Sequence, residues 1–447
     1  MTREVFDVLE NGRGYLELEE RLQEILGNFA RSVLKGVLET ADAELRRSQA
    51  ERPGWVIERR DEAKLIITPF GEVTYRRSYF QHKQTGEYAH LVDRLAGIEP
   101  HCRIDAAAKA QLLENAVDHS YRKSGQKLDV SGQAVLEVVR QFSGQGAGVK
   151  EEAQRRPKRS LRFLYVEADE DHVASQRGRA LQIPLVYVHE GKTGPAKRYK
   201  LKEAHYFAGP YASVEDLWLD VFDYLDSHYE LDRVERVFVA GDGAKWVRAG
   251  AKLLPKATFV LDKFHLKKWI TGAVGTEWRR QSAIWAGIQR GDRKAIEQVL
   301  KEALQEAETV TRRQAVLNCW RYIRSNWDGI EAYQLEGVTG CSAEGHVSHI
   351  LSARLSSRPA GWSKLGAEQM ARLRVMQANG KDVRRAYLRE HRENMTDLLA
   401  LCRRAITEQR QRLDLPWPEQ LGNIPALFGP KSQLTRALKA LRYQYPA

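Results

Sequence analysis

Cysteine is scarce in this sequence, and long apolar runs are missing from it. The four cysteines, Cys102, Cys319, Cys341 and Cys402, form no C-x-x-C pair, which argues against zinc fingers and disulfide scaffolds and fits a reducing cytosol. No run of eighteen apolar residues occurs, so we expect neither a transmembrane helix nor a membrane partner. The acidic N-terminus lacks an apolar signal core and therefore predicts a cytoplasmic protein rather than a secreted one.

Acidic residues are the minority among the charged side chains. The 447 residues include 71 Lys and Arg against 59 Asp and Glu, which gives a net charge of +12. Such a surplus favours an anionic partner, most commonly nucleic acid, and hence a nucleoid-associated location. The alternative is a basic surface that only keeps copies of the protein apart. At this length, with 43% hydrophobic residues, more than one domain with its own core is expected.

The N-terminal third begins with a helix and continues with strands. Apolar residues recur at three- and four-residue steps and predict an amphipathic helix over roughly residues 15–48. Pro69 and Gly71 then punctuate an alternating stretch that is typical of hairpin strands. From Ile104 to Phe142, two short helical segments, the second with Ser131 as N-cap, predict either a helix-turn-helix or an ordinary helical hairpin. The residues that would contact DNA there are Lys123, Lys127, Gln133 and Arg140.

The pattern becomes α/β after a Gly-, Gln- and charge-rich linker, with a domain boundary near residue 145. Three consecutive strands followed by helix–strand–helix–strand predict a mixed sheet with helices on it. From Leu266 to about Ile330 only helical patterns follow. The predicted strands span Arg162–Asp169, Ala180–Gly191, Tyr199–Gly209, Arg233–Gly243 and Ala257–His265.

Acidic residues stand at the ends of two of these strands. Asp169 ends the first strand, in FLYVEADEDHV, and Asp242 ends the fourth between two glycines that allow a sharp turn. Strand ends in an open α/β sheet converge on one crevice, so the pair indicates a metal site, with ordinary turn residues as the alternative. Glu344, beside the candidate N-cap Ser342 in a later helix, is the candidate third acid. Magnesium takes oxygen ligands, and two ions about 4 Å apart promote phosphodiester cleavage by water or a 3′-hydroxyl.

Four motifs carry a resemblance to a known family. YVEADEDHV, VAGDGAKWV, LDKFHLKKWI and CSAEGHVSHILSARLSSRPAGWS, in this order, resemble the ISLre-type transposases of bacterial insertion sequences, a group distantly similar to Mutator-like transposases. The upstream TPFGEVTYRRSYF is similar to the N-terminal part of that family. The resemblance covers roughly Leu65 to Trp362, and the ordered set is specific although any one motif is not.

The resemblance implies an α/β, ribonuclease-H-like mixed sheet with a DDE triad. Asp169, Asp242 and Glu344 match the triad, so the family pattern makes them both catalytic residues and ligands of two Mg²⁺ ions, for which Mn²⁺ substitutes. The helical region before Glu344 matches the insertion that such transposases place before their last acid. A helical and β-hairpin region precedes this core. Rivals for the triad positions are Asp171 for the first, and Glu331 and Glu336 for the third.

Further residues are implied as neighbours of the triad. His265 either orients the scissile phosphate or a metal-bound water, or caps the next helix. Asp262 is either a spare metal ligand or a turn residue, and Glu167 shares a strand face with Asp169. Arg354 and Arg358 suit phosphate binding, with ion pairs on a solvated face as the alternative.

The expected protein is an insertion-sequence transposase that binds double-stranded DNA at terminal inverted repeats and at the target, cuts and transfers strands, and works as a homodimer or larger assembly. The alternative is a transposase-derived DNA-binding protein without catalytic activity. The expected segments are 1–50 (N-terminal amphipathic helix), 51–103 (small β-hairpin region), 104–145 (helical DNA-binding region), 146–160 (basic linker), 161–265 (ribonuclease-H-like catalytic core), 266–339 (all-helical insertion), 340–366 (catalytic helix completing the core) and 367–447 (helical basic C-terminal region).

Overall fold

The chain divides into two compact units. Unit 1 comprises residues 1–105 and 392–447, and unit 2 comprises residues 106–391. The computed structural model describes residues 15–143, 157–195, 199–358, 360–391, 398, 400 and 402–403. Most of the linker predicted at 146–160, and most of the predicted C-terminal region beyond residue 391, therefore lies outside the described residues.

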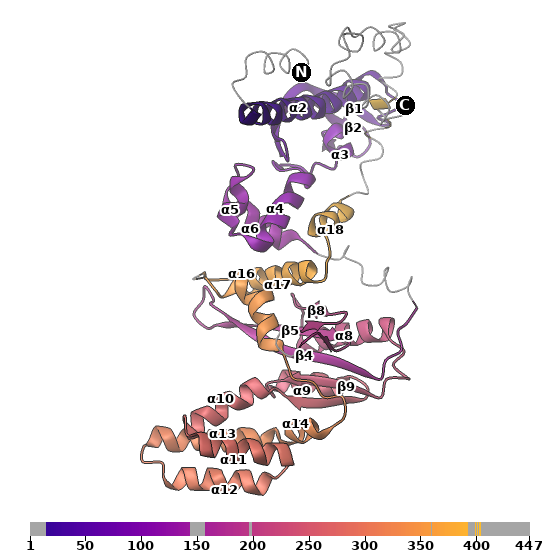
Figure 1. Cartoon of the computed structure of the whole chain (residues 1–447). Helices are drawn as coiled ribbons and strands as arrows, with labels where there is room; N and C mark the ends of the chain where they lie inside the picture. Colours follow the sequence, from indigo (N-terminus) through magenta and orange to yellow (C-terminus); the bar gives the residue numbers. More distant parts are fainter. Residues whose placement is uncertain are drawn as a thin grey trace, which may run out of the picture. The chain divides into compact units, whose positions relative to one another are not determined.

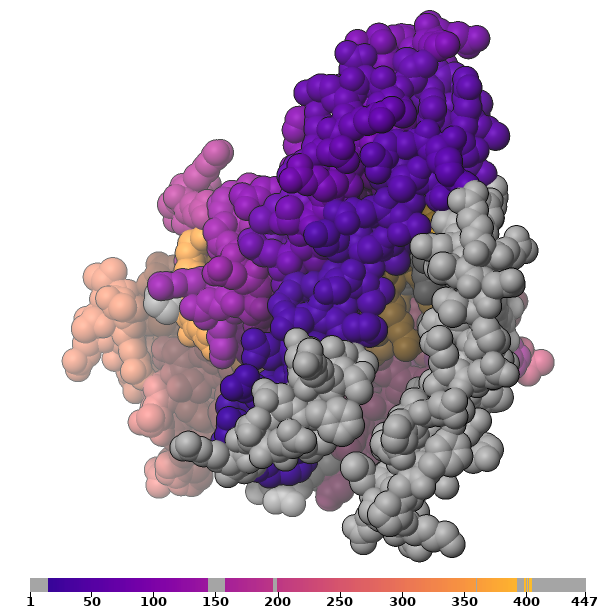
Figure 2. Space-filling view, turned by 90° about the horizontal axis from the view of Figure 1, so that it is seen from above, coloured from indigo at the N-terminus to yellow at the C-terminus, as the bar shows by residue number. Residues whose placement is uncertain are grey.

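Unit 1 is a long helix packed on a small antiparallel sheet. Its elements are α2 (Tyr15–Arg47), β1 (Trp55–Thr68), β2 (Gly71–His82), β3 (Tyr88–Ala89) and α3 (Leu91–Leu95), and the sheet order is β1-β2-β3. The buried carboxylate of Asp42 in α2 accepts hydrogen bonds of 2.8 Å from the backbone N–H and from the hydroxyl of Ser78 in β2. This contact and the apolar side chains around it join the helix to the sheet, and the indigo to violet part of the chain is one continuous body in Figure 2.

Unit 2 is built around a mixed five-stranded sheet of order β10-β9-β4-β5-β8. Strands β4, β5 and β8 pair antiparallel, whereas β9 runs parallel to both β4 and β10. The predicted mixed α/β sheet is thus confirmed. The strands are β4 (Phe163–Val173), β5 (Leu181–His189), β8 (His205–Phe207), β9 (Arg236–Gly241) and β10 (Ala257–Leu261), with a separate ribbon of β6 (Lys192–Thr193) and β7 (Lys200–Leu201).

Three predicted strands differ from the observed ones. The first, predicted to end at Asp169, continues to Val173 because residues 170–173 still pair with β5, so Asp169 lies within β4 rather than at its end. The third, predicted over Tyr199–Gly209, is split: β7 pairs with β6, and only β8 joins the main sheet. The fifth ends at Leu261 instead of His265, because Asp262 caps the following helix by accepting a 3.0 Å hydrogen bond from the backbone N–H of Phe264.

Helices cover the sheet, and a further group of helices packs beyond it on the β9 side (Figure 1). The apolar face of β4, with Leu164, Val166 and Ala168, lies in one core cluster that continues into the predicted insertion. The helices of unit 2 are α4 (Ala106–Asp118), α5 (Tyr121–Gln126), α6 (Gly132–Gln141), α8 (Val214–His228), α9 (Lys245–Leu253), α10 (Lys263–Val274), α11 (Trp278–Arg290), α12 (Arg293–Gln305), α13 (Val310–Ser325), α14 (Trp327–Glu331), α15 (Ala343–Val347), α16 (Ala353–Leu355), α17 (Lys364–Ala378) and α18 (Val383–Glu390), with a 3-10 turn η2 (Ala332–Gln334) and a π-helical segment η3 (Ser348–Ser352).

The helices predicted to bind DNA, α4 to α6, belong to unit 2. Asp118 of α4 forms a 2.6 Å ion pair with Arg374 of α17, and the carbonyl of Ala116 accepts a 3.1 Å hydrogen bond from Arg354 in α16. These helices therefore pack on the helices that follow Glu344. Among the described residues, no helix is both long and apolar enough to cross a membrane.

Candidate active site

Three side chains of the metal-ligand type meet at one edge of the sheet. Asp169 of β4, His265 of α10 and Glu344 of α15 each offer a ligand atom, and these atoms all lie within 4.8 Å of one another. Ligands on opposite sides of a Mg²⁺ ion, each at about 2.1 Å, are about 4.2 Å apart. The three groups are therefore spaced for a single divalent ion, and they come from segments far apart in the sequence.

Asp169 is the buried member of this cluster, with 8% of its surface exposed. One of its carboxylate oxygens accepts a 2.9 Å hydrogen bond from the backbone N–H of Glu170. Burial, together with the negative charges of Glu344 and Asp242, raises the pKa of Asp169 to about 6, although His265 and the hydrogen bond oppose the rise. A buried carboxylate beside like charges is costly without a cation, which fits a metal ligand.

Asp242 reaches the same site from the neighbouring strand. It follows β9 directly, and β9 runs parallel to β4 with Ala240 paired to Glu167, so Asp242 lies level with Asp169. Its carboxylate accepts a 2.8 Å hydrogen bond from the N–H of Ala244, and its carbonyl accepts one of 2.5 Å from the Tyr322 hydroxyl. Its charge acts on Asp169 and on His265, but its oxygens are not among the ligand atoms within 4.8 Å of one another.

His265 is oriented by Asp262. The imidazole Nδ1 lies 2.9 Å from a carboxylate oxygen of Asp262, and this hydrogen bond leaves Nε2 to face a ligand. The same bond raises the pKa of His265, and the charges of Asp169, Asp262 and Asp242 add to the rise against the effect of burial. A carboxylate that holds the second nitrogen is the usual support of a metal-binding histidine.

Glu344 lies in the first turn of α15, as the sequence indicated, but the start of the helix differs from the prediction. Ser342 makes no side-chain cap. Its hydroxyl instead donates a 2.9 Å hydrogen bond to Glu167. Burial alone would raise the pKa of Glu167. The hydrogen bonds from His189 and Tyr187 and the charge of Lys192 have the larger effect, and they lower the pKa of this carboxyl to about 2.

The rivals of the triad residues have other partners. Asp171 accepts hydrogen bonds from the hydroxyls of Ser352 (3.0 Å) and Ser356 (2.8 Å). Glu331 accepts one of 2.7 Å from the Trp327 indole N–H, and the exposed Glu336 pairs with Arg162. Neither Asp171, Glu331 nor Glu336 belongs to the group of ligand atoms around Asp169.

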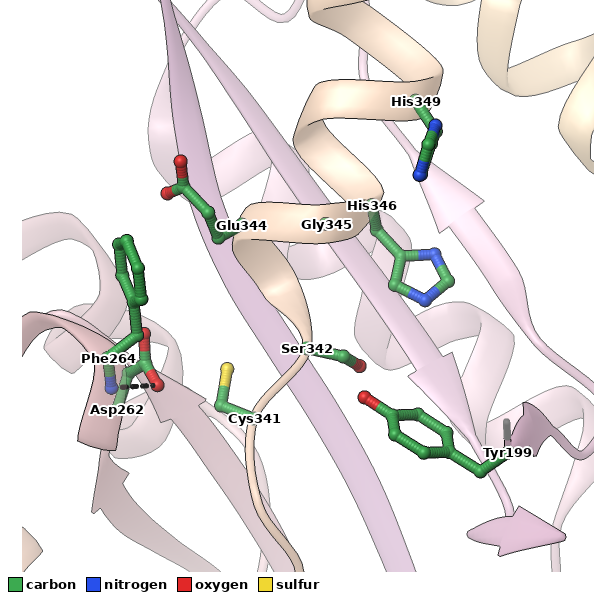
Figure 3. A pocket seen from close by; sticks show the side chains of 9 residues that line it. All are labelled: Tyr199, Asp262, Phe264, Cys341, Ser342, Glu344, Gly345, His346 and His349. Atoms are coloured by element: carbon green, nitrogen blue, oxygen red, sulfur yellow. Dashed lines mark hydrogen bonds between the residues drawn. The ribbon is translucent and has the colours of Figure 1, made fainter. Parts of the chain in front are cut away.

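A cavity of about 410 Å³ opens beside Glu344 (Figure 3). Asp262 and Phe264 lie on one side of the segment that carries Cys341 and Ser342, while His346 and Tyr199 lie on the other. Half of the Phe264 side chain is exposed. The cavity thus joins an acidic edge to an aromatic surface, and the sequence had singled out neither Phe264 nor Tyr199.

Residues 8–392 match the uncharacterised protein family UPF0236. The chain belongs to this family. A UPF0236 protein of Caldanaerobacter subterraneus subsp. tengcongensis that carries four locus names is 36% identical over 446 residues, which cover 98% of this chain and 94% of that protein. A second from the same organism carries eleven locus names and is 35% identical over 98% of this chain and 94% of that protein. The UPF0236 protein in the vanSb 3′ region of Streptococcus gallolyticus is 26% identical over 84% of this chain and 86% of that protein.

The UPF0236 family description names no activity, so the ISLre-type resemblance and its triad stay predictions. Among solved structures, the Drosophila P element transposase strand transfer complex aligns with 67% of this chain and 83% of that chain, with 10% identity and a TM-score of 0.20. A score this low carries no conclusion about a shared fold.

The residues predicted to bind DNA are spread over unit 2 of this UPF0236 chain. Arg354 is turned inward, where its guanidinium lies 5.3 Å from the ring centre of Tyr121 and 5.0 Å from that of Trp362. The Arg358 side chain is exposed. Lys123, Lys127, Gln133 and Arg140 are exposed on or beside α5 and α6.

The stability of the metal-free protein should depend on the charge of Asp169. Its pKa in the folded chain, about 6, lies above the usual 3.8. The stabilising contribution is therefore complete below about pH 3.8 and is lost as the pH rises through about 6, a loss of about 1.4 kcal/mol between pH 5 and pH 7.5. Unfolding in urea with EDTA at both pH values should show this loss in the wild type and not in Asp169→Asn. Equal pH dependence in the two proteins would contradict the assignment.

Proposed function

We propose that this protein is the transposase of an insertion sequence, which binds the terminal inverted repeats of its element and catalyses metal-dependent cleavage and strand transfer of DNA. The observation that supports this most is the convergence of Asp169, His265 and Glu344 within 4.8 Å, with Asp242 at the adjacent strand end. Carboxylates from separate elements, gathered at one sheet edge against their mutual repulsion, are suited to holding divalent cations.

The strand arrangement supports a ribonuclease-H-like core. Three consecutive antiparallel strands, β4, β5 and β8, lie on one side of the sheet, and the parallel β9 and β10 extend it beyond β4. Asp169 lies on the central strand β4, and Asp242 follows its parallel neighbour β9. Helices α10 to α14 stand between Asp242 and Glu344, as the insertion of such transposases would.

The donor set fits divalent ions. Asp169, His265 and Glu344 would hold one ion, and Asp169 with Asp242 would hold a second. The carboxylates suit Mg²⁺ and Mn²⁺, whereas the imidazole of His265 is a donor more typical of Zn²⁺ or Fe²⁺. Bound ions would neutralise the phosphodiester and favour ionisation of the attacking oxygen. Asp262 keeps the His265 ring in place. The proposed reaction is hydrolysis of a phosphodiester at the element end, which leaves a 3′-hydroxyl, followed by attack of that hydroxyl on target DNA.

The locus names of the relatives favour a mobile element. One relative carries four locus names and another carries eleven, all within a single organism. Repetition of one protein at many loci is the result expected when a gene is carried by an element that inserts copies of itself. A glycosidase or another carboxylate-pair hydrolase gives no reason for such repetition.

The proposed partner is double-stranded DNA, at the inverted repeats and at the target. Exposed cations on α5 and in the first turns of α10, including Lys123, Lys127, Lys267 and Lys268, offer phosphate contacts. Lys268 lies one helical turn beyond His265, so a strand held at the metal site would pass close to it. Because two element ends must be held together, we propose a homodimer or a larger assembly.

The deciding experiment uses labelled duplexes that carry the inverted repeats flanking the gene. With Mg²⁺ or Mn²⁺, the wild type should nick the element end, and Glu344→Gln should do so at least about 100-fold more slowly, because even supporting partners of metal ligands contribute 10- to 100-fold. Glu336→Gln is the matched control, since this exposed glutamate pairs with Arg162 away from the cluster. If the wild type binds the ends and never nicks them, the protein is the non-catalytic DNA-binding protein.

A further inference from the structure

One face of β4 carries three buried acids in alternation. Glu167, Asp169 and Asp171 are 2%, 8% and 5% exposed, and a strand directs every second side chain to the same face. Only Asp169 offers a ligand atom to the cluster with His265 and Glu344. The other two acids are as buried as Asp169, so their carboxylates require partners of their own.

Glu167 holds the start of the helix that carries Glu344. One of its carboxylate oxygens accepts hydrogen bonds from the backbone N–H of Ser342 (2.5 Å), from the Ser342 hydroxyl (2.9 Å) and from the Tyr187 hydroxyl. The other oxygen accepts a 3.1 Å hydrogen bond from His189 and lies 3.6 Å from the ammonium of Lys192. Ser342 is thereby fixed two residues before Glu344.

Asp171 holds the same helical stretch further along. A single carboxylate oxygen accepts the hydroxyls of Ser352 at 3.0 Å and of Ser356 at 2.8 Å. Ser352 ends the π-helical segment, and Ser356 follows α16 directly. The two acids of β4 therefore contact the stretch at its beginning and near its end.

The distance between the two acids along β4 agrees with the distance between their serine partners along the helical stretch. Glu167 and Asp171 are four residues apart on a strand, about 13 Å at the usual rise. Ser342 and Ser352 are ten residues apart in helical backbone, about 15 Å. The helical stretch therefore runs beside β4 with its two attachments about as far apart as the two acids, and Glu344 projects between them at the level of Asp169.

We infer that Glu167 and Asp171 are positioning residues that fasten the helical stretch 342–356 to β4, so that Glu344 is held within ligand distance of Asp169. This inference rests on the proposed function only for its catalytic readout. Its first readout, metal affinity, needs no DNA. The third acid lies on a short helix broken by a π-helical segment, and hydrogen-bonded support of this kind fixes metal ligands to within a fraction of an ångström.

The test compares Glu167→Gln and Asp171→Asn with Glu170→Gln. Glu170 lies on the same strand but on the opposite face, where it accepts a 2.6 Å hydrogen bond from the Trp246 indole. Mn²⁺ affinity of the full chain is measured by titration calorimetry. The first two variants should bind Mn²⁺ about 10- to 100-fold more weakly, whereas Glu170→Gln should bind it as the wild type does. Wild-type Mn²⁺ affinity in both Glu167→Gln and Asp171→Asn would overturn the inference, whatever their melting temperatures.

A milder variant covers the case in which a buried substitution prevents folding. Ser352→Ala with Ser356→Ala removes both hydroxyls that Asp171 accepts and leaves every buried acid in place. It should weaken Mn²⁺ binding and lower kcat for DNA nicking while KM for DNA stays within about twofold. An unchanged Mn²⁺ affinity in this variant would overturn the role of Asp171. Weakened Mn²⁺ binding in proteins that never cut DNA, the wild type included, would support the positioning role and refute the transposase.

Discussion

Asp242→Asn is expected to lower metal-dependent cleavage of element ends at least about 100-fold, more than the loss of a supporting residue. Asparagine keeps the oxygen that accepts the hydrogen bond from Ala244, so the turn after β9 should persist. What disappears is the negative charge at the second proposed ion. Binding of the labelled duplex, measured by gel shift in EDTA, should stay within about twofold, because the substitution removes no positive charge.

The matched control for this experiment is Asp232→Asn. Asp232 is exposed and precedes β9 at the opposite end from Asp242, so its loss should leave cleavage unchanged. Retention of cleavage by Asp242→Asn would mean that Asp169, His265 and Glu344 alone hold the working ion. The position of Asp242 outside the 4.8 Å group makes this outcome a real test of the two-ion proposal.

The strand FLYVEADEDHV shows what a sequence can and cannot predict. Its apolar face and its alternating acids are local features, and they identified Asp169 and flagged Glu167 as its neighbour. The partners of those acids are remote: Ser342 is 175 residues from Glu167, and Ser352 is 181 residues from Asp171. No local pattern contains these pairings, so the attachment of the helical stretch 342–356 to β4 could not be predicted from the sequence.

The mixed sheet was predictable because continuous or alternating apolar runs identify most of its strands. The split of the third strand was not, since the pairing of Lys200–Leu201 with Lys192–Thr193 depends on hydrogen bonds between short segments with little apolar content. The packing partners of α4 to α6 could not be predicted for a similar reason. Their contacts with Arg354 and Arg374 join segments more than 230 residues apart.

Of the candidate site, Asp242 followed from the end of its strand and Glu344 from its place at a helix start, and the family resemblance grouped both with Asp169. Asp169 was chosen as a strand-end residue, but it lies within β4. His265 was named only as an auxiliary residue, because the sequence does not distinguish a histidine that orients a ligand from one that caps the next helix. The predicted strand to His265 was too long: α10 starts at Lys263, three residues earlier than a strand ending at His265 would allow. In this helix the imidazole lies within 4.8 Å of the ligand atoms of Asp169 and Glu344.

Gly243→Ala is expected to destabilise the protein by about 3 kcal/mol. Gly243 has φ of +90°, which costs a residue with a side chain about 1–2 kcal/mol. An added Cβ would also lie 2.2 Å from the side-chain oxygen of Asn326, and crowding of a packed site costs about 1–3 kcal/mol. Asn326 is 4% exposed and is held by hydrogen bonds of 2.9 Å with Arg248 and with the Tyr322 carbonyl, so it has little freedom to move.

Urea unfolding of Gly243→Ala beside Gly272→Ala measures this effect. Gly272 lies in α10, and a Cβ there would meet nothing within 4 Å, so its replacement should be neutral or should stabilise the helix by up to about 1 kcal/mol. Because Gly243 directly follows Asp242, the strained turn should also displace the carboxylate and reduce cleavage even at temperatures where the variant is folded. Equal unfolding midpoints for the two variants would show that the turn adapts without strain, and Asp242 would then owe its position to β9 and the Tyr322 hydroxyl rather than to the glycine.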